Sequence, residues 1–145
     1  MKPVKFSVAA VIKNPSNLEE ILAVKRDPND ESFPGVWALP AVTLKAGELP
    51  EDAVRRIGNE KLATKIKPVS TIGIRSADRG DYESILMDVE AKLVGKEPSV
   101  KDAVTQGSKY VGQKWTSDYT IFIEAAKKGG LCDRIYLESK GISWD

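Results

Sequence analysis

The chain of 145 residues contains no histidine and a single cysteine, Cys132. Without histidine there is no Ser-His or Cys-His nucleophile pair, no histidine metal ligand and no histidine general base. Proton transfer would therefore depend on Asp, Glu, Lys or Tyr side chains. A lone cysteine forms no disulfide within the chain, which is typical of the reducing cytoplasm, so we expect a cytoplasmic protein. Cys132 lies in the amphipathic pattern GGLCDRIYLE, which favours a small core residue over a reactive thiol.

Long hydrophobic runs and an excess of one charge are also missing. The longest apolar run, VAAVI, is far shorter than the roughly 20 residues of a membrane-spanning helix. The N-terminal MKPVKF leads directly into a strand-like segment, with no signal-peptide pattern. The formal net charge of +1 gives no indication of nucleic acid or an anionic membrane as a partner. The length fits one domain with a sizeable core, so we expect a single domain over residues 1–145.

What is present is a series of short apolar segments separated by turn residues. Alternating and β-branched patterns predict strands at 5–14, 19–26, 36–40, 41–44, 67–76, 83–94 and within 109–117. Helices are expected at 51–64, 118–130 and 131–141, the first opened by Pro50 with acidic residues in its first turn. This order favours a mixed sheet covered by helices, in the α/β or α+β class.

The stretch from Leu39 to Thr64, here called the loop–helix segment, carries the most informative spacing. A strand ends at Pro40, a Gly-Glu turn follows, and seven residues separate Glu48 from Arg56. These features resemble the Nudix hydrolase family, whose box reads G-x5-E-x7-R-E-U-x-E-E-x-G-U, where U is a bulky aliphatic residue. The order of strands and helices resembles the family over most of the chain. The resemblance implies a Nudix-like mixed β-sheet between helices and a pyrophosphohydrolase that uses Mg²⁺ or Mn²⁺.

Several positions of the box depart from the family pattern. The opening Gly is Val42, the Glu after the Arg is Ile57, the Glu pair is Glu60 and Lys61, and the closing Gly is Ala63. Shifting the alignment by one residue also leaves a single helix carboxylate. Carboxylates three and four residues apart share one helix face and are the oxygen ligands that these ions prefer. The altered set therefore predicts a weak metal site.

The resemblance also assigns roles to the residues that match. In the family, the Arg of the box pairs with the early Glu and holds the loop against the helix, which implies a structural ion pair between Glu48 and Arg56. Glu48 and Glu60 are the candidate catalytic and metal-binding residues. For Glu60, an exposed partner of Arg56 one helical turn away is an equally open interpretation.

Two basic residues are candidate ligand-binding groups. Lys61 stands where the family has a carboxylate, and its ammonium would bind a phosphate directly as a point charge. The alternative, which we favour, is a solvated helix lysine. Arg26 ends the second strand, where the family often has a basic residue facing the phosphates of the substrate. The alternative there is an ordinary surface arginine.

Two further sets of residues have both a functional and a structural interpretation. A catalytic base from a later loop is known in the family, although a solvated hairpin turn is favoured for Asp78, Arg79, Asp81 and Glu83. Four aromatic residues would stack on a base, although core or sheet positions are favoured for the two tryptophans: Trp37, Tyr82, Tyr110 and Trp115.

Two function hypotheses follow. The first is a pyrophosphohydrolase that cleaves a nucleoside diphosphate linked to another group by metal-assisted attack of water, with weak or altered activity. The second is a noncatalytic domain of the same fold that binds a nucleotide-like ligand or a protein partner and needs no metal. In both, the small-molecule partner is a nucleotide or another pyrophosphate-containing compound.

Overall fold

The computed structural model describes residues 1–104 and 110–145. The strands are β1 (Val4–Asn14), β2 (Asn17–Arg26), β3 (Trp37–Ala38), β4 (Ala41–Thr43), β5 (Ile66–Asp78), β6 (Glu83–Leu93) and β7 (Tyr110–Thr116). The helices are α1 (Pro50–Arg56), the π-helical turn η1 (Ile57–Lys61), the 3-10 turn η2 (Tyr119–Phe122), α2 (Ile123–Lys127) and α3 (Leu131–Ser139).

The strands form one mixed sheet in the order β3-β2-β1-β6-β5, with β4 paired to β1 and β7 paired to β2. β1 and β6 run parallel, and the remaining pairs are antiparallel. β4 pairs with Ser7–Ala9 of β1, whereas β2 pairs with β1 at Lys13 and Asn14. β4 and β2 therefore pair with different stretches of β1.

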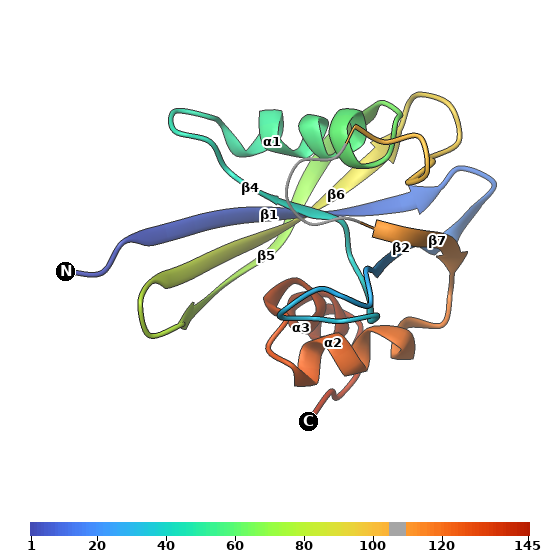
Figure 1. Cartoon of the computed structure of the whole chain (residues 1–145). Helices are drawn as coiled ribbons and strands as arrows, with labels where there is room; N and C mark the ends of the chain where they lie inside the picture. The colour runs from blue at the N-terminus through green and yellow to red at the C-terminus, as the bar shows by residue number, and fades with distance from the viewer. Residues whose placement is uncertain (105–109) are drawn as a thin grey trace.

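Helices cover both faces of the sheet, with α1 on one side and α2 and α3 on the other (Figure 1). The alternation of β1 explains this arrangement, because its successive side chains point to opposite faces. Val8, Ala10 and Ile12 join the core cluster under α1. Ala9 and Val11 join the cluster under α3. The mixed sheet between helices agrees with the fold class predicted from the sequence.

The helix expected at 51–64 is only partly correct. It opens at Pro50 and has acidic residues in its first turn, as the sequence indicates. Regular α-helix stops at Arg56, however, and a π-helical turn continues to Lys61. Gly58 lets the chain return close to this turn, because a Cβ atom at this position would lie 2.9 Å from the carbonyl oxygen of Thr64. Ala63, with a φ of 50°, then turns the chain away.

The C-terminal helices also differ from the prediction. The segment expected as one helix at 118–130 is the 3-10 turn η2 followed by the short α2. Gly129, with a φ of 103°, ends this segment, and α3 begins two residues later. The strand expected within 109–117 is β7, and residue 109 lies outside the described residues. In the described part of the chain, no helix is long and apolar enough to span a membrane.

Candidate ligand-binding site

Glu48 and Arg56 tie the loop to the helix. The Nε and Nη2 atoms of Arg56 donate to the two carboxylate oxygens of Glu48, each at 3.0 Å. Arg56 also donates from Nη2 to the carbonyl oxygen of Thr43 at 2.8 Å, and the N–H of Lys45 donates to Glu48 at 3.0 Å. The hydrogen bonds from Arg56 are the main reason that the pKa of Glu48 is lowered. The loop, the helix and β4 thus meet at a single bidentate ion pair.

The two predicted metal-binding carboxylates are both engaged by cations. Both oxygens of Glu48 accept from Arg56. Glu60 accepts from Arg56 Nη1 at 3.3 Å, and its other oxygen lies 3.9 Å from the ammonium of Lys45. Across residues 1–104 and 110–145, no group of three or more His, Cys, Asp or Glu is arranged to hold a metal ion. The side chains of the loop–helix segment therefore do not fit a divalent ion.

The remaining box positions face inward. Ile57 is completely buried in the core cluster under α1. Lys61 is only 4% exposed, and its ammonium lies 5.8 Å from the centre of the Tyr110 ring. The interpretation of Lys61 as a solvated helix lysine is therefore wrong, because the π-helical turn ends with this side chain inside the protein.

The environment of Lys61 disfavours its charged form. Burial is the main reason that the pKa of Lys61 is lowered. The positive charges of Arg26 and Arg56 act in the same direction, against the negative charge of Glu60. Lys61 thus lies among charged side chains of both signs.

Lys61 and Arg56 line a cavity of about 770 Å³. Its walls come from β1, β4, the loop after β2, the β5–β6 turn and the start of α3. A cavity of this size accommodates a nucleotide or a similar small molecule. Among the described residues, six lining side chains are cationic: Lys5, Arg26, Arg56, Lys61, Arg79 and Lys128.

Arg26 enters the cavity from the end of β2. Its Nη2 atom donates to Asp30 at 2.7 Å, and its guanidinium lies 5.4 Å from the centre of the Phe33 ring. The side chain is 17% exposed, so the interpretation as an ordinary surface arginine is wrong. Asp30 also accepts from the backbone N–H groups of Ser32 and Phe33. These contacts orient Arg26 and the loop together at the mouth of the cavity.

Two buried carboxyl groups were missed by the sequence analysis. Asp133, 1% exposed, is the one acidic residue among the described residues that line the cavity. It accepts from the N–H of Leu39 at 3.4 Å, and burial raises its pKa to about 7. Asp88 is fully buried, and neither of its oxygens has a hydrogen-bond partner among the described residues. Burial, and then the charge of Asp133, raise the pKa of Asp88 well above its ordinary value.

Of the other residues predicted as candidates for the site, some line the cavity and others make structural contacts. Arg79 and Tyr82 line the cavity, whereas Asp78 pairs with Lys2 at 2.6 Å on the surface. Tyr110 is 4% exposed, and its hydroxyl accepts from the N–H of Ala41 at 2.9 Å, which indicates a structural role. Cys132 is buried, in agreement with its assignment to the core.

The two tryptophans among the candidates are partly buried. The Trp37 ring lies 5.9 Å from the ammonium of Lys25 and 4.5 Å from that of Lys114. Trp115 donates from Nε1 to Glu97 at 2.5 Å. Both side chains thus make contacts within the fold, as favoured from the sequence.

Comparisons with known proteins agree on the family and on the fold. A family model described as the NUDIX domain matches residues 3–110. A MutT protein from Methanosarcina mazei Go1 is 20% identical, with a TM-score of 0.69 over 96% of this chain and 97% of that chain. A NUDIX hydrolase from Nitrosomonas europaea is 21% identical, with a TM-score of 0.70 over 97% of this chain and 89% of that chain.

A more distant similarity is to an ADP-ribose pyrophosphatase from Streptococcus suis 89-1591. It is 16% identical, with a TM-score of 0.61 over 94% of this chain and 91% of that chain. Comparison with curated proteins gave no match. At these identities the solved structures establish the fold.

Proposed function

Because the chain belongs to the NUDIX family, we propose that it binds a nucleotide-like, pyrophosphate-containing small molecule in the cavity through its own cationic side chains. Metal-assisted hydrolysis is weak or lost in this proposal. The family membership supports the class of ligand, and the side chains of the cavity support the mode of binding.

The observation that carries the proposal is the position of Lys61. This residue occupies a box position that the family fills with a carboxylate, and it is 4% exposed on the cavity wall. Burial, and the positive charges of Arg26 and Arg56, disfavour the charged form of Lys61, against the negative charge of Glu60. A phosphate bound here would favour the charged form and would raise the pKa of Lys61 again. The three cations together would provide the positive charge that a divalent ion provides elsewhere in the family.

The same residues argue against efficient hydrolysis. Metal ions would supply charge neutralisation and an activated water molecule when bound, but the carboxylates of this segment do not fit them. Arg56 already occupies both oxygens of Glu48, and Glu60 lies between Arg56 and Lys45. Ile57 offers no ligand atom. What the segment retains is the ammonium of Lys61, which would hold an anion as a point charge.

The test is a thermal-shift screen of ADP-ribose, UDP-glucose and ADP, with formation of the nucleoside monophosphate, AMP or UMP, measured by chromatography on the same samples. We expect a ligand-dependent rise in melting temperature in EDTA, because ligands that bind the native state stabilise it. We expect turnover with Mg²⁺ or Mn²⁺ far below the roughly 10 s⁻¹ of a median enzyme.

A matched pair of variants ties the shift to the cavity. Lys61→Met removes the charge and keeps an apolar chain of similar length in a buried position. Lys65→Met makes the same change at an exposed lysine four residues further on. The shift should disappear in the first variant and persist in the second. Ordinary turnover that depends on metal and is lost in Glu60→Gln would instead establish the hydrolase hypothesis.

A further inference from the structure

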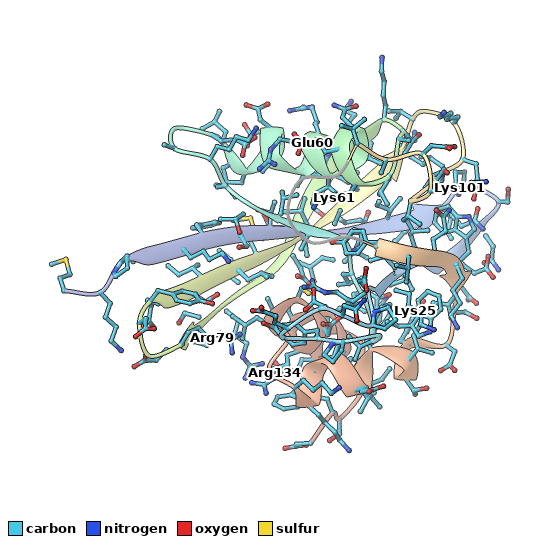
Figure 2. All side chains as sticks on the ribbon, in the orientation of Figure 1. Lys25, Glu60, Lys61, Arg79, Lys101 and Arg134 are labelled. Carbon is cyan, nitrogen blue, oxygen red and sulfur yellow. The ribbon has the colours of Figure 1, made fainter. Side chains whose placement is uncertain are left out.

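The cationic side chains of the cavity form two separate groups. The first consists of Arg26, Arg56 and Lys61, whose mutual influence appears in the lowered pKa of Lys61. The second lies where the β5–β6 turn meets the link between α2 and α3. Figure 2 shows Lys61 with Glu60 on the α1 side of β1, and Arg79 with Arg134 on the opposite side.

The second group consists of Lys5, Arg79 and Lys128, which all line the cavity. Arg79 donates from Nη2 to the carbonyl oxygen of Gly129 at 2.7 Å, which fixes it beside Lys128. The N–H of Arg79 donates to the carbonyl oxygen of Tyr82 at 2.9 Å. The ammonium of Lys5 lies 5.7 Å from the centre of the Tyr82 ring, which places Lys5 beside the β5–β6 turn that also carries Arg79.

Apart from the cations and Asp133, the described residues that line the cavity wall are neutral. They include apolar side chains and hydroxyl groups: Leu39, Ala41, Leu86, Leu131, Ser7 and Ser84. The acidic residue in this wall, Asp133, is 1% exposed, and its pKa of about 7 leaves it partly protonated near neutral pH. A ligand that matches this pattern is anionic at both ends and neutral in the middle.

Positive charge at the second end is already crowded. Arg134, on α3, has a lowered pKa because of burial first and then because of the charges of Arg75 and Arg79. Glu138 pairs with Arg75 and partly compensates this cluster. Lys128 has an exposed partner in Glu124 at 3.4 Å, a type of contact that contributes little. An anion at this end would reduce the repulsion among the cations.

We infer that the ligand of the cavity carries a second anionic group, bound by Lys5, Arg79 and Lys128 at the end remote from Lys61. The chemical class is an elongated small molecule with phosphate or carboxylate at both ends, such as a nucleoside diphosphate whose distal substituent is itself anionic. This inference rests on the proposed function for the first anionic group and adds the second.

The test uses α,ω-alkanediol bisphosphates of increasing chain length, each compared with the monophosphate of the same alkane by calorimetry in EDTA. Linking two anionic groups that engage both ends at once raises the effective concentration of the second. We expect one range of lengths at which the bisphosphate binds more than about tenfold tighter than its monophosphate. Shorter and longer bisphosphates should lose this gain.

The variants assign the gain to the second end. Lys5→Ala combined with Lys128→Ala should remove it while leaving monophosphate affinity within about twofold of the parent. Arg79→Ala should act in the same way, with its melting temperature recorded because Arg79 also bonds to Gly129. Lys127→Ala is the matched control, since this neighbouring lysine is exposed and lies outside the cavity lining.

Two results would overturn the inference. One is the absence of any chain length at which the bisphosphate binds tighter. The other is a gain that survives in the Lys5 and Lys128 double variant. If Lys61→Met still weakens monophosphate binding in either case, the first anionic site and the proposed function stand without the second. Absence of monophosphate binding in the parent would contradict both.

Discussion

The two halves of the loop–helix segment have different relations to the family pattern. The first half, the loop with α1, keeps Glu48 and Arg56 in a bidentate pair whose side chains are 14% and 16% exposed. The second half, η1, places a buried isoleucine and a buried lysine where the pattern has carboxylates. The part of the box that fixes backbone geometry is thus separable from the part that binds metal. In this chain the first part holds the loop against the helix, and the second part contributes Ile57 to the core in place of a metal-binding carboxylate.

The largest expected effect comes from restoring carboxylates in the second half. Ile57→Glu with Lys61→Glu would place a charge in the core cluster under α1, where Ile57 is fully buried. We expect a loss of more than about 4 kcal/mol in the free energy of unfolding, because a buried, unpaired charge is poorly tolerated. Mn²⁺ should not restore the lost stability, since the side chain at position 57 faces the core.

Thermal unfolding across a Mn²⁺ series measures this effect. Ile57→Leu is the control and should cost less than about 1.5 kcal/mol, because it conserves volume. A double variant that folds and gains more stability from Mn²⁺ than the parent would show that η1 still has metal-site geometry.

Breaking the ion pair of the first half should have the next largest effect. Arg56→Ala removes the donor to the carbonyl of Thr43 and leaves Glu48 with the N–H of Lys45 alone, so we expect a loss of about 2–4 kcal/mol. The melting temperature should fall by roughly 5–10 °C. Arg55→Ala, which removes an exposed pair with Asp52, should change stability by less than about 0.5 kcal/mol. Equal effects in the two variants would mean that the stability of the loop and α1 does not depend on the Glu48–Arg56 pair.

A change of pH distinguishes the loop from the cavity wall, because the pKa of Glu48 in the loop is lowered and the pKa of Asp133 in the cavity wall is raised. The pKa of Glu48 is lowered, so its contribution to stability is present at neutral pH and is lost as the pH falls through its folded pKa. The pKa of Asp133 is raised from 3.8 to about 7, so its contribution is present below about pH 4 and is lost as the pH rises to 7. Asp88 acts in the same direction as Asp133.

Melting temperatures from pH 4 to pH 8 test this sign. Asp133→Asn should stabilise the protein at pH 8 relative to pH 4, by on the order of 1–4 kcal/mol. Glu48→Gln should do the reverse and cost more at pH 8 than at pH 4. Parallel pH profiles for the parent and Asp133→Asn would mean that Asp133 is not titrating in this range.

The smallest expected effect is that of metal on the free protein. Calorimetric titration with Mg²⁺ or Mn²⁺ should show no site tighter than the millimolar range, about 4 kcal/mol of binding. Both oxygens of Glu48 are already occupied by Arg56, and Glu60 has cationic neighbours. A micromolar site that disappears in Glu60→Gln would contradict this account of the second half.

The main elements of the fold could be predicted from local pattern. β1 and β6 alternate between two buried faces, and Pro50 with its acidic neighbours fixes the start of α1. The end of that helix could not be predicted, because the turn that follows it brings Gly58 close to the carbonyl of Thr64. This contact is tertiary and leaves no periodic signal.

Burial of the charged residues was the other failure of the sequence analysis. An exposed lysine is the usual expectation for a helix end, yet the π-helical turn places Lys61 in the cavity wall. Asp88 left no signal, because it falls between Met87 and Val89 in β6 and alternates with the mostly polar set that includes Glu90. Asp133, in contrast, has apolar neighbours on α3. An acid whose neighbours on one helix face are apolar, as for Asp133 with Tyr136 and Leu137, therefore indicates a buried carboxyl group.

The most direct test of the central claim is the affinity for methylenediphosphonate, a pyrophosphate analogue that is not hydrolysed, measured by calorimetry in EDTA. If side-chain cations have replaced the metal, the parent should bind it without metal, and Lys61→Met should weaken binding by at least about tenfold, or 1.4 kcal/mol. Lys65→Met should bind as the parent does. Binding that appears only when Mn²⁺ is added, and that is unchanged in Lys61→Met, would contradict the account.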